Sequence, residues 1–383
     1  MKIPIAWLQL QKDRWRLVIA VGGVAFAVIL VFMQLGFRDA LFTSAVRMHT
    51  RFKYDLAMIS PRTPTLIYTA GISRQRVAQA RGFEGVLSAE SVNLGYARWK
   101  NPTKPEIRRG IYMIGFDPST DVIDIPGFDR YRGELQKADV CLYDRSSRKE
   151  FGPIADLVQE NGSYDVELAD RKLHVAGLFE LGTSFGIDAN ILVSDLNYYR
   201  YNPEVPRRSV QLGLIRIEPD TDVLEVRERL TASLPSDVLL LTRDEFMQRE
   251  VDYWDSATPI GFVFGLGSLV GLIVGAIIVY QILFADVTDH MKEYATLKAM
   301  GYSNSKLSGI VLRQAMLLAT FGFVPAVGIA MLLYRTAGAA TKLPMEMTLP
   351  RAAAVYGLTL LICVLSATIA QRKVRKADPA ELF

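Results

Sequence analysis

The residues that most often carry chemistry in proteins are few and scattered in this chain. Its three histidines, His49, His174 and His290, are far apart, and no His-Glu-x-x-His or Cys-x-x-Cys spacing occurs. A zinc site needs such grouped ligands, so we predict no metal site. Cys141 stands between two aliphatic residues in a strand-like run, where a lone cysteine is more often a packed core residue than a nucleophile. The sequence therefore predicts no catalytic residues, which disfavours a membrane enzyme.

A phosphate-binding motif is also missing from the sequence. A P-loop needs Gly-Lys followed by Ser or Thr, so that backbone N–H groups and the lysine reach the phosphates. The dipeptide Gly-Lys does not occur anywhere in the 383 residues. We therefore expect no cofactor in this chain, and any ATP hydrolysis that serves it must come from another polypeptide.

Long uncharged segments dominate the rest of the pattern, in a chain of which 50% is hydrophobic. A helix crosses the hydrocarbon core of a membrane with roughly 20 apolar residues, and it satisfies its own backbone hydrogen bonds there. The first segment is too long for the apolar region of a signal peptide, and no Ala-x-Ala cleavage site closes it. We predict four transmembrane helices, at residues 17–37, 256–285, 308–334 and 352–371.

The distribution of Lys and Arg predicts the orientation, because basic residues beside a span are retained in the cytoplasm. Both ends of the chain are basic, with Lys2, Lys12, Arg14 and Arg16 at one and Arg372, Lys373, Arg375 and Lys376 at the other. We expect an inner-membrane protein with both termini cytoplasmic, residues 1–16 forming an amphipathic segment and residues 372–383 a basic tail. The net charge of +4 sits largely in these flanks and does not indicate a nucleic-acid partner.

With this orientation, residues 38–255 and the connection 335–351 are periplasmic, whereas residues 286–307 are cytoplasmic. The two cysteines cannot pair, because Cys141 lies outside and Cys363 lies within the fourth span. The outer domain must then be held together by its core and not by disulfides.

The outer segment 38–255 contains two similar halves. A strand, a helix at Ser73 to Arg81 and another strand occupy residues 54–102. The second half repeats that order. It has alternating apolar residues from Val210, then a helix with Asp222 and Glu225 as a capping box, and then an apolar run at Val238 to Leu241. The region between, about 106–206, reads as a β-rich insertion. We predict an α+β domain with a ferredoxin-like core plus this insertion.

Small residues mark one face of the second span. Gly267, Gly271 and Gly275 follow at intervals of four, so the absent side chains lie on one side of the helix and allow another helix to approach closely. The pattern predicts a close helix contact, either within the chain or between two copies.

The cytoplasmic connection carries the most informative pattern. Residues at helical spacing are apolar, Lys298 suits a last turn, and Gly301 can end a helix in the left-handed conformation; the apolar residues are Val287, Met291, Tyr294 and Leu297. The acidic residues among them make it a poor binder of anionic lipid. We expect an amphipathic helix along the inner surface that binds a protein, with Tyr294 and Leu297 as anchors and Glu293 and Lys298 at the rim. Asp378-Pro379-Ala380-Glu381 predicts one further helical turn near the end of the chain.

These segments resemble a known family. The order of one span, an outer domain and three spans is similar to that of the FtsX-like permeases of MacB-type ABC transporters. Glu293-Tyr294-Ala295-Thr296-Leu297-Lys298-Ala299-Met300-Gly301 resembles their cytoplasmic coupling segment, and Arg372 to Leu382 resembles their basic ending. The run from Tyr280 to His290 is similar to the DevC permeases in particular, as are Ser91 to Tyr96 and Arg109 to Phe116 in the outer domain.

The resemblance implies a homodimer that sits in membrane lipid and is bound to two copies of a separate DevA-like ATPase, which holds ATP and Mg. It implies a DevB-like periplasmic adaptor, a TolC-like outer-membrane channel, and mechanical export, with glycolipid as the cargo of DevC itself. The residues expected to couple to the ATPase are Glu293, Tyr294, Ala295, Thr296, Leu297, Lys298 and Gly301. An alternative within the same family is a transmitter that activates a periplasmic cell-wall hydrolase.

Overall fold

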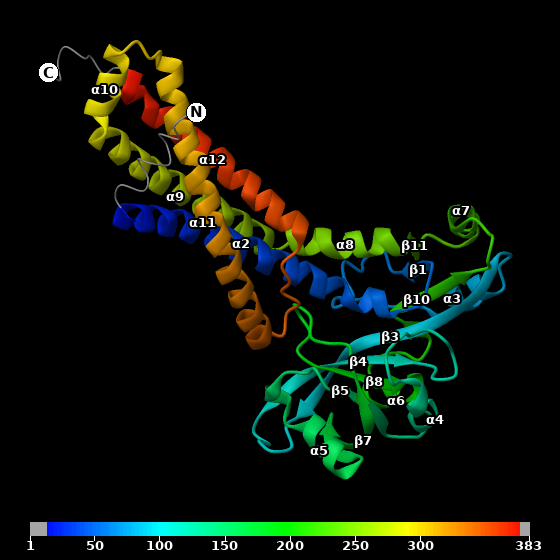
Figure 1. Ribbon diagram of the computed structural model, residues 1–383. Coiled ribbons are helices and arrows are strands. Elements are labelled where there is room, and N and C mark those ends of the chain that lie inside the picture. Colours follow the sequence, from blue (N-terminus) through cyan, green and yellow to red (C-terminus); the bar gives the residue numbers. More distant parts are fainter. Residues whose placement is uncertain (1–13, 376–383) are drawn as a thin grey trace. The chain divides into compact units, whose positions relative to one another are not determined.

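A computed structural model describes residues 14–375, which form two compact units (Figure 1). The membrane unit comprises the described residues up to Ala40, Pro259–Thr341 and the described residues from Met345 onward. The outer domain comprises Leu41–Thr258 with Lys342–Pro344. Residues 1–13 of the predicted amphipathic segment, residues 376–383 of the predicted tail and the predicted turn at Asp378 lie outside the described residues.

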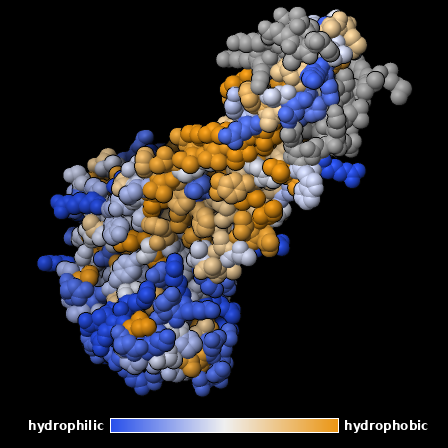
Figure 2. Space-filling view, turned by 90° about the vertical axis from the view of Figure 1, so that its left-hand side faces the viewer, coloured by the Kyte–Doolittle hydropathy of each residue, from blue (hydrophilic) through white to orange (hydrophobic). Residues whose placement is uncertain are grey.

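The membrane unit is built from long apolar helices. Four helices among the described residues are long and apolar enough to cross a membrane: α2 (Arg14–Arg51), α9 (Pro259–Asp289), α11 (Asn304–Thr341) and α12 (Leu349–Arg375). The short helix α10 (Met291–Ala299) lies between α9 and α11 in the chain. Figure 2 shows apolar side chains gathered over these helices, and a mostly hydrophilic surface over the outer domain. The predicted four-helix membrane architecture is confirmed.

Two helices extend past the predicted ends of their spans. Helix α2 has 38 residues, and at about 1.5 Å per residue it is far longer than a hydrocarbon core of about 30 Å. Its end at Arg51 belongs to the outer domain, so one continuous helix enters both units. Helix α11 runs to Thr341, and the outer connection expected at 335–351 is therefore reduced to residues 342–348.

The ferredoxin-like core of the outer domain is present. Its strands are ordered β11-β1-β10-β3, all antiparallel, and helices α3 and α7 join them in two β-α-β units. The elements are β1 (Leu56–Ile59), α3 (Arg74–Arg81), β3 (Val86–Lys100), β10 (Leu212–Ile217), α7 (Val223–Ser233) and β11 (Leu239–Thr242). Val77 and Ala80 of α3 and Val226 and Leu230 of α7 are buried together with one face of this sheet. Helix α8 (Arg243–Ser256) then leads toward the second span.

The β-rich insertion continues the same sheet and forms no second one. Strand β4 pairs with the second half of β3, and β8, β5, β7 and β6 follow it, giving a sheet of nine strands. Strand β6 also pairs with the end of β3, where Trp99 faces Leu168, so six strands close into a ring. The added elements are β4 (Arg108–Phe116), α4 (Arg132–Leu135), β5 (Val140–Asp144), α5 (Ile154–Asn161), β6 (Tyr164–Leu168), β7 (Arg171–Phe179), β8 (Asn190–Ser194) and α6 (Asp195–Tyr201), with 3-10 turns at Asp129–Tyr131 and Lys149–Phe151 and a two-strand pair of β2 (Ile72–Ser73) and β9 (Ser209–Val210).

Helix caps in the outer domain follow the sequence closely but not everywhere. The helix expected at Ser73 to Arg81 is present as α3, and Ser73 caps it, its hydroxyl accepting from Gln75 N. Asp222 caps α7 by accepting from Leu224 N, and the reciprocal capping box predicted there occurs instead at the start of α8, between Thr242 and Glu245. The difference arises because the Asp222 carboxylate bonds the second N–H of its helix and not the third.

Cys141 is a core residue of the strand ring. It is fully buried among apolar side chains such as Val175 and Val193, and burial raises the pKa of its thiol. A thiol held protonated in an apolar core is unreactive. The packing interpretation of Cys141 is confirmed.

Candidate functional site

The candidate site at the inner end of the membrane unit is a short helix set off by a break. Helix α9 ends at Asp289 and α10 begins at Met291, with His290 between them. The His290 ring lies over the last turn of α9, its Nδ1 3.0 Å from the Asp286 carbonyl oxygen and 3.5 Å from an Asp286 carboxylate oxygen. Both side chains are buried, so the break is a packed and defined feature of the chain.

The predicted coupling residues are brought together on α10, but not all of them face outward. Tyr294 and Ala295 are buried in the membrane unit, with 1% and 0% exposure. Glu293 and Thr296 are exposed, and Leu297 and Lys298 are half-buried. Tyr294, which we expected to be an anchor for a partner, is buried within its own chain, so its predicted coupling role stays a prediction.

Large apolar side chains do reach the surface immediately after α10. Met300 and Tyr302 are 63% and 40% exposed. They flank Gly301, which has a φ of +89° and open space around it. The N–H of Gly301 donates to the Lys298 oxygen at 3.0 Å, and the N–H of Tyr302 donates to the Leu297 oxygen at 3.1 Å. These bonds end the helix in the manner predicted and fix the direction of the two exposed side chains.

The glycine face of α9 packs against α2 of the same chain. A Cβ added to Gly275 would lie 2.8 Å from the Cβ of Ala27, and one added to Gly271 would lie 3.5 Å from Val31. At Gly267 it would meet the Gln34 side chain at 2.7 Å. Within the single chain, the three glycines therefore allow α2 to approach α9 closely.

Helix α2 is also held by α11. The Tyr334 hydroxyl donates to the backbone oxygen of Phe32, and the rings of Phe32 and Phe323 lie 5.9 Å apart. A Cβ at Gly322 would meet Val24 at 2.5 Å, so the two backbones approach closely there as well. The helix that continues into the outer domain is thus packed tightly on two sides.

A buried polar network joins the outer part of α2 to α8. The Glu250 carboxylate is 1% exposed and accepts from Leu66 N at 2.9 Å and from Trp254 Nε1 at 3.0 Å, and its Oε2 lies 3.5 Å from His49 Nε2. The Tyr54 hydroxyl lies 3.2 Å from His49 Nδ1. Burial raises the pKa of the Tyr54 hydroxyl.

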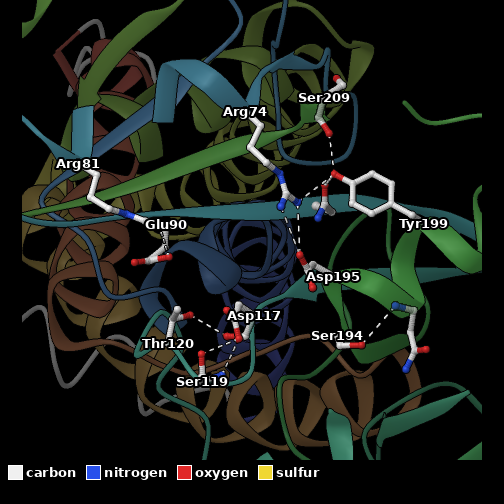
Figure 3. Close-up of polar contacts among 12 residues, drawn as sticks. Arg74, Arg81, Glu90, Asp117, Ser119, Thr120, Ser194, Asp195, Tyr199 and Ser209 are labelled. Atoms are coloured by element: carbon white, nitrogen blue, oxygen red, sulfur yellow. Dashed lines mark hydrogen bonds and ion pairs between the residues drawn. The ribbon is translucent and has the colours of Figure 1, made fainter. Parts of the chain in front are cut away.

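A second set of polar contacts joins the ferredoxin-like core of the outer domain to its strand ring. Arg74 at the start of α3 points toward Asp195 and Tyr199 of α6, as Figure 3 shows, with distances of 3.4 Å to the carboxylate and 3.3 Å to the hydroxyl. The same hydroxyl lies 2.8 Å from Asn93 Oδ1 and 2.7 Å from the Ser209 oxygen. The ferredoxin-like core and the strand ring are therefore tied through one tyrosine.

The sequence reasoning did not find the His49 and Glu250 network. A signal was present in the apolar spacing of Ala45, Met48 and Phe52, which carries the amphipathic pattern of α2 past the span and places His49 beside it. No local feature indicates the contacts of Glu250 with His49 and Leu66, because both residues lie in segments far from it in the chain. Among residues 14–375, no group of three His, Cys, Asp or Glu is arranged to hold a metal ion.

Four long apolar helices and one large α+β domain define a polytopic membrane protein with a single water-exposed domain. The family model of the MacB-like periplasmic core domain matches residues 17–233, more than half of the chain, and that of the FtsX-like permease C-terminal region matches residues 265–379. The chain belongs to the MacB/FtsX-like family of ABC transporter permeases. It is thus a membrane subunit with a periplasmic domain, and the ATPase of such a transporter is a separate chain.

Solved structures of two outer domains are similar to this chain. The periplasmic region of MacB from Actinobacillus actinomycetemcomitans has 10% identity and a TM-score of 0.36, covering 54% of this chain and 96% of its own. The extracellular domain of the noncanonic ABC-type transporter YknZ from Gram-positive bacteria has 12% identity and a TM-score of 0.32, covering 49% and 99%. No curated protein sequence matches the chain.

Proposed function

We propose that this chain is the permease subunit of a MacB-like tripartite exporter in the inner membrane, with both termini in the cytoplasm. A separate DevA-like ATPase binds ATP and Mg and docks on the inner surface of a homodimer of the chain. The resulting movement of the outer domain drives cargo through a DevB-like adaptor and a TolC-like duct. Glycolipid is the cargo class that the DevC resemblance suggests.

The observation that carries this proposal is the surface presented by α10 and the turn after it. Two spans with apolar exposed faces flank a short segment that exposes Glu293, Thr296, Met300 and Tyr302. A few apolar anchors within a charged rim are the usual composition of a protein interface. The absence of a P-loop in the sequence supports a partner that supplies the ATPase activity.

Continuity of α2 supports a mechanical role for the outer domain. The helix has no break between Arg14 and Arg51 and contributes residues to both units, which supports a role in transmitting movement between them. There the buried carboxylate of Glu250 ties it to α8, which leads directly to the second span. A contact whose energy differs between ATPase states is sufficient to shift such a linked pair of helices.

The test is to remove the exposed anchors and measure ATPase binding. Met300→Ala with Tyr302→Ala should weaken binding of the ATPase by about 30-fold, since loss of interface anchors costs about 2 kcal/mol. The matched control is Leu196→Ala with Leu224→Ala, which removes exposed apolar side chains from the outer domain. Unchanged binding and unchanged stimulated hydrolysis in the first variant would contradict the proposal that the ATPase docks on this surface.

Export and signalling are separated by what co-purifies with the wild-type chain. Recovery of an adaptor and an outer-membrane duct is the expected result. Recovery of a cell-wall hydrolase or its regulator in their place would establish the transmitter and overturn export, while leaving the ATPase contact in place.

A further inference from the structure

A row of aromatic rings lies at one edge of the outer domain. The ring centroids of Tyr68 and Tyr253 are 6.2 Å apart, those of Tyr253 and Trp254 are 5.3 Å apart, and those of Trp254 and Phe185 are 4.9 Å apart. The two end members are unusually open for aromatic residues, Tyr68 being 57% and Phe185 40% exposed, whereas Trp254 is buried. The row therefore has a buried centre on α8 and two exposed ends on separate loops.

Both loops are held firmly in place. The loop with Tyr68 is bonded at Leu66, whose N–H donates to Glu250 and whose oxygen accepts from the buried Tyr112 hydroxyl. The loop with Phe185 is bonded at Gly186, whose oxygen accepts from the Tyr96 hydroxyl at 2.8 Å. The exposure of the two rings is thus imposed by the fold and is not a result of loose loops.

The second loop is also anchored by the buried carboxylate of Asp144. This group accepts from the N–H groups of Leu181 and Gly182, at 3.3 and 2.8 Å, and from Asn190 Nδ2 at 2.9 Å. These bonds set the backbone that leads to Phe185. A loop with this many buried bonds presents its side chains at a fixed place.

Only short stretches of chain separate the aromatic row from two of the spans. Helix α9 begins at Pro259, five residues after Trp254, and five residues of chain span at most about 18 Å. The loop carrying Phe185 is tied a second time, because the Thr183 hydroxyl lies 3.5 Å from the oxygen of Lys342, in the connection between α11 and α12. This edge is therefore connected to the spans by two short stretches of chain.

We propose that this edge is a membrane-contacting surface, with Tyr68 and Phe185 inserted in the headgroup layer of the outer leaflet. Tyr and Trp favour this layer because their rings are apolar at one end and polar at the other. The Tyr253 and Trp254 rings support the inserted pair from behind. The bound partner is lipid, and the contact holds whether or not the protein exports cargo.

A consequence for the outer domain is that it rests on the bilayer as well as on its two helices. Exposure of aromatic rings to water is unfavourable, and transfer of their surface into the interfacial layer stabilises the arrangement in which the outer domain contacts the bilayer. Movement of the domain away from the membrane would cost the free energy of this lipid contact. The contact therefore favours the position in which the domain lies on the bilayer.

The experiment measures how close these side chains lie to lipid in the full chain. Spin labels are attached at Tyr68→Cys, at Phe185→Cys and, as a control, at Leu196→Cys in protein reconstituted in lipid nanodiscs. Leu196 is 67% exposed and lies on α6. The native cysteines, Cys141 and Cys363, are buried, and the chain without an added cysteine gives the background labelling.

Collisions with lipid-soluble oxygen and with a water-soluble nickel complex are then compared. Labels at positions 68 and 185 should show an oxygen-to-nickel ratio several-fold above that of the control at 196. Ratios equal to the control would overturn the proposal, because the edge would then face water. Shielding from both agents would also overturn it, in favour of a protein partner or a second copy covering the edge.

Discussion

The outer domain and the membrane unit are stabilised at their critical helix contacts by opposite means. In the outer domain, α2 meets α8 through the buried charged group of Glu250, which has three partners. In the membrane unit, α2 meets α9 through the absence of side chains at Gly271 and Gly275. One helix thus uses a directional polar contact at its outer end and a close apolar contact at its inner end.

The difference follows from the surroundings of each contact. Lipid tails are as apolar as the helices, so burial of apolar surface cannot drive helices together there, and close packing must do so. In the outer domain the hydrophobic effect already stabilises the packed core. A buried polar group there favours one arrangement of the helices, and breaking its network costs a large free energy of unfolding. The comparison predicts different sensitivities to substitution at the two ends of α2.

The largest effect is expected from Glu250→Ala. The substitution leaves Leu66 N and Trp254 Nε1 without their acceptor and removes the carboxylate that lies 3.5 Å from His49 Nε2. Breaking a buried polar network of this kind by removing one member costs about 3–5 kcal/mol. We expect the free energy of unfolding of the outer domain to fall by that amount, as measured by pulse proteolysis of the full chain. Asp252→Ala, which removes an exposed carboxylate from the same helix, is the control. A loss no larger than that of the control would show that the network adds no stability.

A smaller effect is expected from Gly275→Ile in the membrane unit. The added side chain would begin 2.8 Å from the Cβ of Ala27, and overpacking of this kind costs about 1–3 kcal/mol. Gly265→Ile is the matched control, since nothing lies within 4 Å of a Cβ there. Thermal unfolding in lipid nanodiscs compares the two variants. If Gly275→Ile separated a dimer while the single chain kept its stability, the glycine face would serve a contact between subunits.

The smallest effect is expected from Arg74→Ala, which compares an exposed ion pair of the outer domain with the buried network of Glu250. The pair with Asp195 is long and partly exposed, with side-chain exposures of 39% and 23%. Ion pairs of this kind contribute at most about 1 kcal/mol. Chemical denaturation of the variant should therefore show a shift well below that of Glu250→Ala. A comparable shift would mean that the Tyr199 junction, and not the α2 contact, is the main polar tie of the domain.

Local patterns in the sequence were sufficient for much of the fold. Uncharged runs of membrane-crossing length predict the spans because the bilayer fixes the length that a helix needs, whatever its neighbours. Asp222 predicts the start of α7 because a cap involves residues adjacent in the chain. The order of strands and helices led to the ferredoxin-like core, since few topologies join two β-α-β units in one sheet.

The sequence alone determined which residues are apolar, at what spacing, and which segments form the spans. Only the tertiary structure decided what covers each apolar face. Periodicity placed Tyr294 on an apolar stripe, but its burial inside the chain is a feature of the tertiary packing. The contact of His49 with Glu250 and the closure of the ring between Trp99 and Leu168 have the same origin. Each joins segments far apart in the chain, and their meeting depends on the free energy of the whole packed domain, which no local window of residues contains.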